Sequence, residues 1–313
     1  MAKSRIWPVI GAGALKRRGV QGFLYAVGLL AFVVLVLFFI SKKNGEAGIK
    51  KREVLRNWEN GSYNEVFDQS SLALKNKPLD SFFLTVNGFA SYQLAISQIN
   101  QKDTLSYLDS SIWSLRKILL EKNADRDGRI RYVLGKAYYE KGPEYADLAI
   151  RYLEEAGNAG YGAKDIPEYL GLAYHAVREY RKSVETLSRA LDPGQSGTDS
   201  DRLLLAIARS YIGLEDWDNA KAYLTRCIEQ TLDGGAGINA RLLLGKVLLN
   251  SGDAAGAESV YTEVLEDTEN AEAAYELGEI YAAQGDTIRA RAAWRRAYRA
   301  DNNYRPARVR LNM

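Results

Sequence analysis

Small and large apolar residues recur at regular intervals along most of the chain. Leucine-glycine pairs place glycines at positions 135, 171, 245 and 278, and Ala208 fills the same place in the gap between the second and third pair. Successive positions lie 36, 37, 37 and 33 residues apart, and a tyrosine or leucine follows three residues after each. Spacings of three and four put side chains on one helix face, so each interval predicts an amphipathic helix.

A second apolar stripe follows within each interval. There a small residue precedes a large one by four positions, as in Ala149 and Leu153 or Ala290 and Trp294. Short turns such as Gly252-Asp253 separate the two stripes. Each interval therefore predicts two packed helices, with the small residues allowing close approach. Because one hairpin cannot bury its own apolar face, neighbouring hairpins must stack.

This spacing resembles the tetratricopeptide repeat (TPR), in which W-x-x-L-G-x-x-Y, then A-x-x-x-F and a later P, run over 34 residues. Residues 271–304 fit best, through Leu277, Gly278 and Tyr281, although Ala274 and Asn302 replace the family's Trp and Pro. The resemblance implies an all-α, TPR-type α-solenoid of stacked helical hairpins. Five repeats are expected within residues 128–304, at 128–163, 164–200, 201–237, 238–270 and 271–304.

The flanking segments carry weaker signals. Residues 44–122 predict degenerate helical repeats, including a helical pair over 80–122 with a longer loop around Gln101–Asp103. Extra residues within the regular repeats are expected in Gly/Ser-rich loops at Asp192–Ser200 and Leu232–Gly237. Residues 305–313 are expected to form a basic C-terminal tail.

The most apolar stretch of the chain lies near its beginning. Val20–Ile40 carries no charge, and at 1.5 Å per residue a helix of this length spans about 30 Å, the thickness of a bilayer core. Residues 20–41 therefore predict one N-terminal transmembrane helix, preceded by a basic tail at residues 1–19. Its length and the absence of a small-x-small site directly after Ile40 favour a retained anchor over a cleaved signal peptide.

Basic residues flank this segment on both sides, so the positive-inside rule is nearly balanced. We expect the short basic N-terminus to stay in the cytoplasm and the large C-terminal part to be translocated, because long domains cross largely regardless of charge. The sequence thus favours a single-pass protein of a bacterial inner membrane with a periplasmic repeat domain.

Candidate catalytic and metal-binding chemistry is scarce. The chain has 313 residues, a net charge of +3, one cysteine and one histidine. Cys227 falls in an apolar helical stripe and is expected in the core, while His175 is the one imidazole that acid–base chemistry would have. No phosphate-binding loop of the form G-x-x-x-x-G-K-[ST] is present. We therefore expect no enzyme activity, no cofactor and no metal site.

The resemblance to the TPR family implies a concave groove lined by the first helix of each repeat. Positions carried over from the family make a mixed tyrosine and basic surface, and both residue types are favoured at binding interfaces. The lysine/asparagine clamp of chaperone-binding members is absent, because its asparagine position holds Lys136, Leu172, Arg209, Lys246 or Glu279. The expected partner-binding residues of the groove are Tyr132, Lys136, Tyr139, His175, Arg209, Lys246 and Tyr275.

The charge of the chain changes sign near its C-terminus. Ten acidic residues and no Lys or Arg lie between Asp253 and Ile288, whereas eight arginines and one acid lie between Arg289 and Arg310. These arginines can complement a helix dipole or pair with the preceding acidic hairpin. The alternative is a docking end for an acidic partner or an anionic lipid surface, carried by Arg295, Arg299 and Arg308. No nucleic acid is expected, because no interleaved aromatic platform accompanies the charge.

Together these features favour a membrane-anchored, protein-binding scaffold or assembly factor of a bacterial envelope complex, such as the cell-wall, secretion or flagellar-motor machinery. Self-association into a ring or filament is a natural variant, because the two ends of a solenoid are different surfaces. The alternative is a receptor or regulatory module that binds a peptide or small molecule and signals through its membrane helix.

Overall fold

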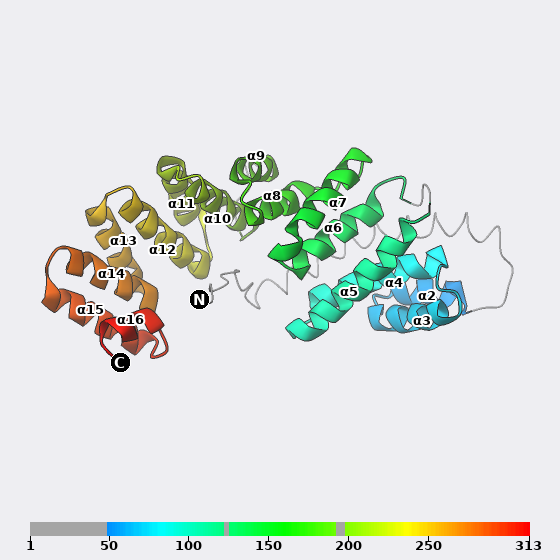
Figure 1. Cartoon of the computed structure of the whole chain (residues 1–313), viewed down its shortest axis with the longest axis horizontal. Coiled ribbons are helices and arrows are strands. Elements are labelled where there is room, and N and C mark those ends of the chain that lie inside the picture. Colours follow the sequence, from blue (N-terminus) through cyan, green and yellow to red (C-terminus); the bar gives the residue numbers. More distant parts are fainter. Residues whose placement is uncertain (1–48, 122–124, 192–197) are drawn as a thin grey trace. The chain divides into compact units, whose positions relative to one another are not determined.

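The computed structural model describes residues 49–121, 125–191 and 198–313. All the regular elements in these ranges are helices. The chain divides by its internal contacts into a first unit, residues 1–161, and a second unit, residues 162–313. Figure 1 shows the helices of each unit in sequence order. None of the helices within the described ranges is long and apolar enough to cross a membrane. The expected transmembrane segment, residues 20–41, lies outside the described residues.

The first unit contains three helical hairpins, each made of a first helix and a second helix that pack against one another. A short 3-10 helix, η1 (Pro143–Tyr145), precedes the last second helix. The helices are α2 (Lys51–Glu59), α3 (Tyr63–Asn76), α4 (Ser81–Ser97), α5 (Gln101–Ile118), α6 (Arg129–Lys141) and α7 (Ala146–Asn158).

The second unit continues the same pattern through four more hairpins and one short final helix. Even-numbered helices are the first helices of their hairpins and odd-numbered helices are the second. The helices are α8 (Ile166–Ala176), α9 (Tyr180–Ala190), α10 (Thr198–Gly213), α11 (Trp217–Gln230), α12 (Gly234–Asn250), α13 (Ala254–Asp267), α14 (Ala271–Ala283), α15 (Thr287–Ala300) and α16 (Arg305–Arg310).

The turns inside the hairpins explain why each second helix starts where it does. Gly252 and Gly285 adopt the left-handed region, with φ of 88° and 82°, which costs a glycine little because it has no Cβ. The next residue is an aspartate that caps the second helix: Asp253 accepts from the Gly256 N–H and Asp286 from the Arg289 N–H. The Gly-Asp pairs seen in the sequence are therefore a turn and an N-cap.

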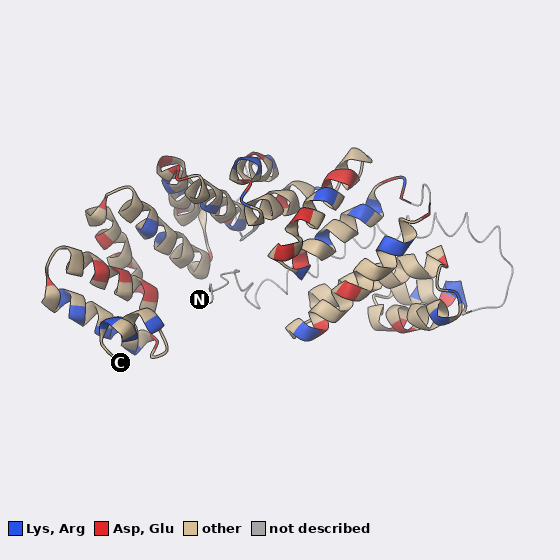
Figure 2. Ribbon diagram, in the orientation of Figure 1, with Lys and Arg blue, Asp and Glu red and all other residues tan. Residues whose placement is uncertain are grey.

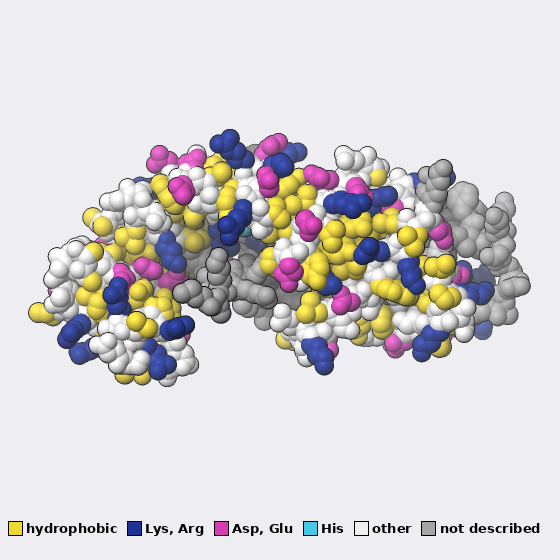
Figure 3. Space-filling view, viewed as in Figure 1, with side chains coloured by type: hydrophobic (Ala, Val, Ile, Leu, Met, Phe, Trp, Pro, Cys, Tyr) yellow, Lys and Arg dark blue, Asp and Glu magenta, His cyan; other side chains and the backbone are white. Residues whose placement is uncertain are grey.

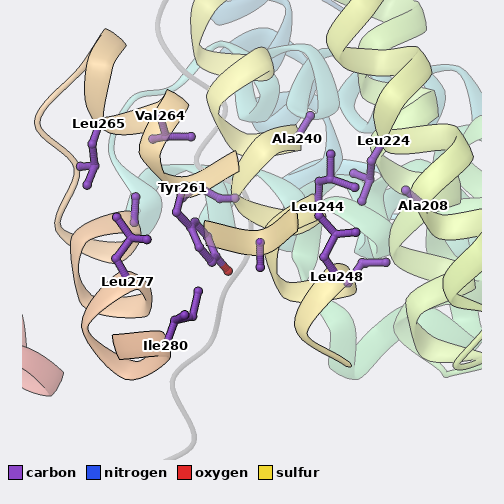
Figure 4. Packing of buried hydrophobic residues seen from close by; sticks show 14 of the residues in the cluster. Ala208, Leu224, Ala240, Leu244, Leu248, Tyr261, Val264, Leu265, Leu277 and Ile280 are labelled. Carbon is purple, nitrogen blue, oxygen red and sulfur yellow. The ribbon is translucent and has the colours of Figure 1, made fainter. Parts of the chain in front are cut away.

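The small residues of the first helices pack against large residues of the second helices, as the spacing predicts. At Gly135 an added Cβ would lie 2.6 Å from Leu153 Cγ, and at Gly278 it would overlap the ring of Trp294. The same arrangement places Leu187 on Gly171 and Tyr261 on Gly245. Figure 4 shows Tyr261 between Leu244 and Leu248 of α12 and Leu277 and Ile280 of α14. One buried core therefore runs continuously through the stacked helices from α10 to α16.

Four segments differ from their expected structure. Residues 198–200, expected in the Gly/Ser-rich loop at Asp192–Ser200, are the first residues of α10. Gln101–Asp103, expected in a longer loop, is the first turn of α5, because the Asn100 side chain accepts from the Lys102 N–H and caps the helix. Within Leu232–Gly237, α12 begins at Gly234, because Asp233 accepts from the N–H groups of Gly235 and Ala236. The basic C-terminal segment forms α16, in which Ala307 is fully buried against the core.

Candidate protein-binding face

The expected groove residues lie on first helices in both units. Tyr132, Lys136 and Tyr139 lie on α6 in the first unit. Lys136 Nζ donates to Tyr132 Oη at 3.1 Å, and the Tyr132 ring lies 4.9 Å from that of Tyr161. Tyr132 is buried and Tyr139 half-buried. The side chains of Tyr132 and Lys136 therefore already contact other residues of the first unit.

The other groove residues lie on successive first helices of the second unit. These side chains lie on one side of α8, α10, α12, α14 and α16, which we call the first-helix face. Figure 1 shows α10, α12 and α14 following one side of the unit. Ion pairs bridge neighbouring helices across this face. The pairs are Glu168 with Arg202, Lys246 with Glu272, and Glu279 with Arg310.

Among the residues that the structure describes, no such ion pair joins α10 to α12. Arg209 on α10 occupies the same repeat position as Lys246 on α12, yet it makes no salt bridge or hydrogen bond with any residue that the structure describes. Glu272 is the acid that pairs with Lys246. The residue at the equivalent position one repeat earlier is Asn239. Arg209 is half-buried, and this burial lowers the pKa of its guanidinium. An arginine nevertheless stays charged at neutral pH, so the face holds a cation for which the described residues supply no acidic partner.

His175 lies beside this cation and is held by hydroxyl groups. Its Nδ1 is 3.0 Å from Ser210 Oγ, and Ser210 Oγ is 2.9 Å from Ser183 Oγ. Ser183 donates to the Gly171 carbonyl at 2.7 Å, so the chain of polar contacts ties α8, α9 and α10 together. Burial lowers the pKa of His175, and the positive charge of Arg209 lowers it further. The imidazole is therefore neutral at pH 7 and serves as a structural bridge.

This bridge predicts a pH dependence of stability. Because the pKa of His175 is lower in the folded chain than its ordinary value of 6.5, the unfolded chain takes up the proton first as the pH falls. The stabilising contribution is complete above pH 6.5 and is lost as the pH falls through 6.5 towards the folded-state pKa. We expect urea unfolding of the full chain in mild detergent to show this loss. The variant His175→Gln should lack it, and an identical pH profile for both proteins would contradict this assignment.

The C-terminal end of the first-helix face is aromatic and acidic. Tyr275 on α14 packs edge-to-face on Tyr304 at 5.8 Å, and it borders a cleft of about 540 Å³ against Arg305, Val309 and Arg310. Glu276, on the same helix, makes no hydrogen bond or salt bridge within the described ranges. Burial raises its pKa, and the neighbouring carboxylates raise it further against the effect of Lys246.

The C-terminal arginines divide into two groups. Three pair with acids of the preceding helices or turns: Arg289 with Glu258 and Asp286, Arg296 with Glu269, and Arg310 with Glu279. The other five are exposed and make no salt bridge or hydrogen bond with described residues. We call these five the arginine surface. Figure 2 shows basic residues along α15 and α16, and Figure 3 shows basic side chains over the same part of the chain. They are Arg291, Arg295, Arg299, Arg305 and Arg308.

The structure also reveals contributors to these surfaces that were absent from the expected site. Asn239 matters because it offers Arg209 no acid where the next repeat has Glu272. Glu276 matters because it is a half-buried carboxylate between two ion pairs. Comparing the same repeat position in neighbouring repeats would have found Asn239 in the sequence, since Glu272 is its counterpart one repeat later.

Comparisons with known proteins agree with this architecture. The family model of the tetratricopeptide repeat-like domain matches residues 168–312. No curated protein sequence matches the chain. The C-terminal part of a TPR repeat-containing protein from Cytophaga hutchinsonii is 15% identical, with a TM-score of 0.61 over 84% of this chain and all of that one. This likeness establishes a shared fold.

Two further solved structures are more distant in shape. A tetratricopeptide repeat protein from Parabacteroides merdae is 15% identical, with a TM-score of 0.49 over 85% of this chain and 98% of that one. YrrB, described as a TPR protein with an unusual peptide-binding site, is 20% identical, with a TM-score of 0.47 over 64% of this chain and 98% of that one. The family model thus identifies residues 168–312 as a tetratricopeptide repeat-like domain.

Proposed function

We propose that the protein is a non-catalytic scaffold that holds other proteins at a bacterial inner membrane, as part of an envelope complex. Stacked helical repeats present extended surfaces that bind proteins or peptides. The observation that carries this proposal is Arg209, a half-buried cation on the first-helix face whose acidic counterpart is missing from the described part of the fold.

A partner that supplies the missing acid would fit this position. Half-burial without a counter-ion costs free energy, and a carboxylate from a bound segment would offset that cost with a charge-assisted, bidentate hydrogen bond. The neighbouring cations of the face, Arg202, Lys246 and Arg310, already have acids within the fold. The bound segment therefore carries an aspartate, a glutamate or a C-terminal carboxylate at the α10–α12 junction.

The arginine surface supplies a second docking site. Its five cations lie outside the internal ion pairs of the last hairpin, so their charge is available to an acidic partner surface. Opposite charges on two surfaces speed their encounter and fix their relative orientation. The membrane location rests on the sequence of residues 20–40, and a periplasmic repeat domain follows from the expected orientation.

The proposal is tested by capture from native membranes. Full-length protein, cross-linked briefly in its own membranes and purified in mild detergent, should recover one recurrent set of partners. Arg295, Arg299 and Arg308 all changed to Glu should reduce recovery at low salt by about tenfold or more, because attraction becomes repulsion. Changing the same residues to Gln should have a smaller effect and leave helicity intact.

Two results would contradict the proposal. If the Glu variant recovers the partner proteins as well as the wild type does, the arginine surface contributes to solubility and not to docking. Recovery of the protein alone would point to self-assembly or a small ligand. The orientation is tested separately by a reporter fused after Met313, which should be active outside the cytoplasm.

A further inference from the structure

The chain enters the described part of the first unit at one particular edge. Lys51, the first residue of α2, pairs with Asp80 just before α4, with Nζ 3.2 Å from Oδ2. The same ammonium lies 4.9 Å from the ring centre of Phe82 and 5.3 Å from that of Phe83. The beginnings of α2 and α4 therefore lie side by side.

The ends of α3 and α5 meet the same edge. Residues 77–80 connect α3 to α4, so α3 ends beside Asp80. Ser81 Oγ donates to Glu121 Oε1 at 3.2 Å, which places the end of α5 beside the start of α4. The chain arriving from residues 1–48 therefore emerges beside the loops that follow α3 and α5.

This edge exposes large apolar side chains. Leu79 is 63% exposed, Leu120 is 80% exposed and Trp113, near the end of α5, is 51% exposed. Trp113 also lines a largely apolar cleft of about 660 Å³ between α3 and α5, together with Leu74 and Pro78. A cluster of exposed leucines and a tryptophan at one edge is typical of a surface that another apolar phase covers.

Unneutralised lysines accompany these apolar residues. Lys75, Lys77 and Lys117 make no salt bridge within the described residues, and Lys117 Nζ lies 3.5 Å above the Trp113 ring. The acids near this edge are Asp80, which Lys51 neutralises, Glu121, and Glu53 in the first turn of α2. We call the surface formed by Lys51, Lys75, Lys77, Leu79, Trp113, Lys117 and Leu120 the tether edge.

The length of the preceding chain limits how far this edge can lie from a membrane. Ten residues lie between Ile40, the end of the apolar segment, and Lys51. Even fully extended, they span at most about 40 Å. If residues 20–40 cross a bilayer, the edge at which the chain emerges is held close to the headgroups.

We propose that the tether edge rests on the surface of an anionic bilayer. Tryptophan prefers the interface between headgroups and acyl chains, leucines bury apolar area there, and lysines are attracted to anionic headgroups by about 1 kcal/mol each. This inference rests on the membrane anchor of the proposed function. It adds that the first unit lies against the lipid.

An environment-sensitive fluorophore tests this contact in the full-length protein. Single cysteines are introduced as Leu79→Cys and Leu120→Cys and labelled with nitrobenzoxadiazole, while the native Cys227 is fully buried and stays unlabelled. Ile99→Cys is the matched control. Ile99 is a 96% exposed apolar residue in the turn between α4 and α5, at the opposite edge of the same hairpin.

In nanodiscs containing phosphatidylglycerol we expect a blue-shifted emission at positions 79 and 120 and none at 99. Changing Lys75, Lys77 and Lys117 together to Glu should remove more than roughly half of the shift, and high salt should weaken it. Emission at 79 and 120 equal to that at 99, with the protein integrated in the disc, would overturn the inference and leave the anchor standing.

Other outcomes assign the edge differently. A shift that appears equally in detergent and rises with protein concentration would make the edge a contact between copies of the chain. Failure of the protein to integrate into discs would remove the anchor, and the inference would fall with it.

Discussion

Replacing Tyr261 by alanine is expected to destabilise the second unit by about 3–5 kcal/mol, the cost of truncating a large buried aromatic side chain. Tyr261 on α13 is fully buried, and its ring lies against Gly245 of α12. Its neighbours in the core include Leu248 of α12 and Leu277 of α14. Because stacked repeats depend on their neighbours, the loss should appear as faster hydrogen exchange throughout α12 to α15.

The matched variant Tyr261→Phe is expected to behave differently. The Tyr261 hydroxyl is buried and has no hydrogen-bond partner among the described residues. Burial of the hydroxyl raises its pKa, and the nearby carboxylates of Glu276 and Glu272 raise it further. A buried hydroxyl without a partner costs about 1–3 kcal/mol, so removing it should leave stability unchanged or higher. A phenylalanine variant less stable than wild type by more than about 1 kcal/mol would show that the hydroxyl has a partner.

Replacing Arg209 by methionine is expected to lower partner capture by at least about tenfold, since hydrogen bonds to charged groups contribute about 1.5–3 kcal/mol. Stability should be equal or higher, because the substitution removes a half-buried charge that has no counter-ion among the described residues. Loss of binding with a gain in stability distinguishes a binding residue from a structural one. The pKa of His175 should also rise, because Arg209 helps to lower it. NMR can follow this titration directly, since the chain has a single histidine.

A second substitution tests the same site without changing Arg209. Asn239→Glu places an acid where Glu272 stands in the next repeat and should neutralise Arg209 from within the fold. We expect partner capture to fall as in Arg209→Met, with Asn239→Gln as the control that keeps it. If both Arg209→Met and Asn239→Glu capture partner proteins as well as the wild type does, Arg209 does not take part in partner binding.

The sequence predicts the helical repeats because their apolar spacing reflects a physical contact. Leucine-glycine pairs locate the first helices, since the glycine must accept a large side chain such as Leu187 or Trp294 from the second helix. Helix starts are harder to place. Gly234 and Gly235 suggest a loop, but they lie in the first turn of α12 because the Asp233 side chain caps the helix.

The functional surfaces were less predictable for a different reason. Arg209 and Lys246 occupy equivalent positions, and both were expected at the binding surface. Only their surroundings separate them: Glu272 pairs with Lys246, whereas Arg209 is left without an acid in the described part of the chain. The tether edge could not be recognised from repeat spacing, because the repeats of residues 44–122 depart from the regular pattern.

The most direct test of the scaffold account is site-specific photo-cross-linking in native membranes. A photoreactive residue at exposed position 239 on α12 lies on the first-helix face, and one at exposed position 266 on the second helix α13 serves as the control. The account predicts adducts with a partner protein from position 239 that disappear when Arg209 is also changed to Glu. Adducts from position 266 and none from position 239 would contradict it.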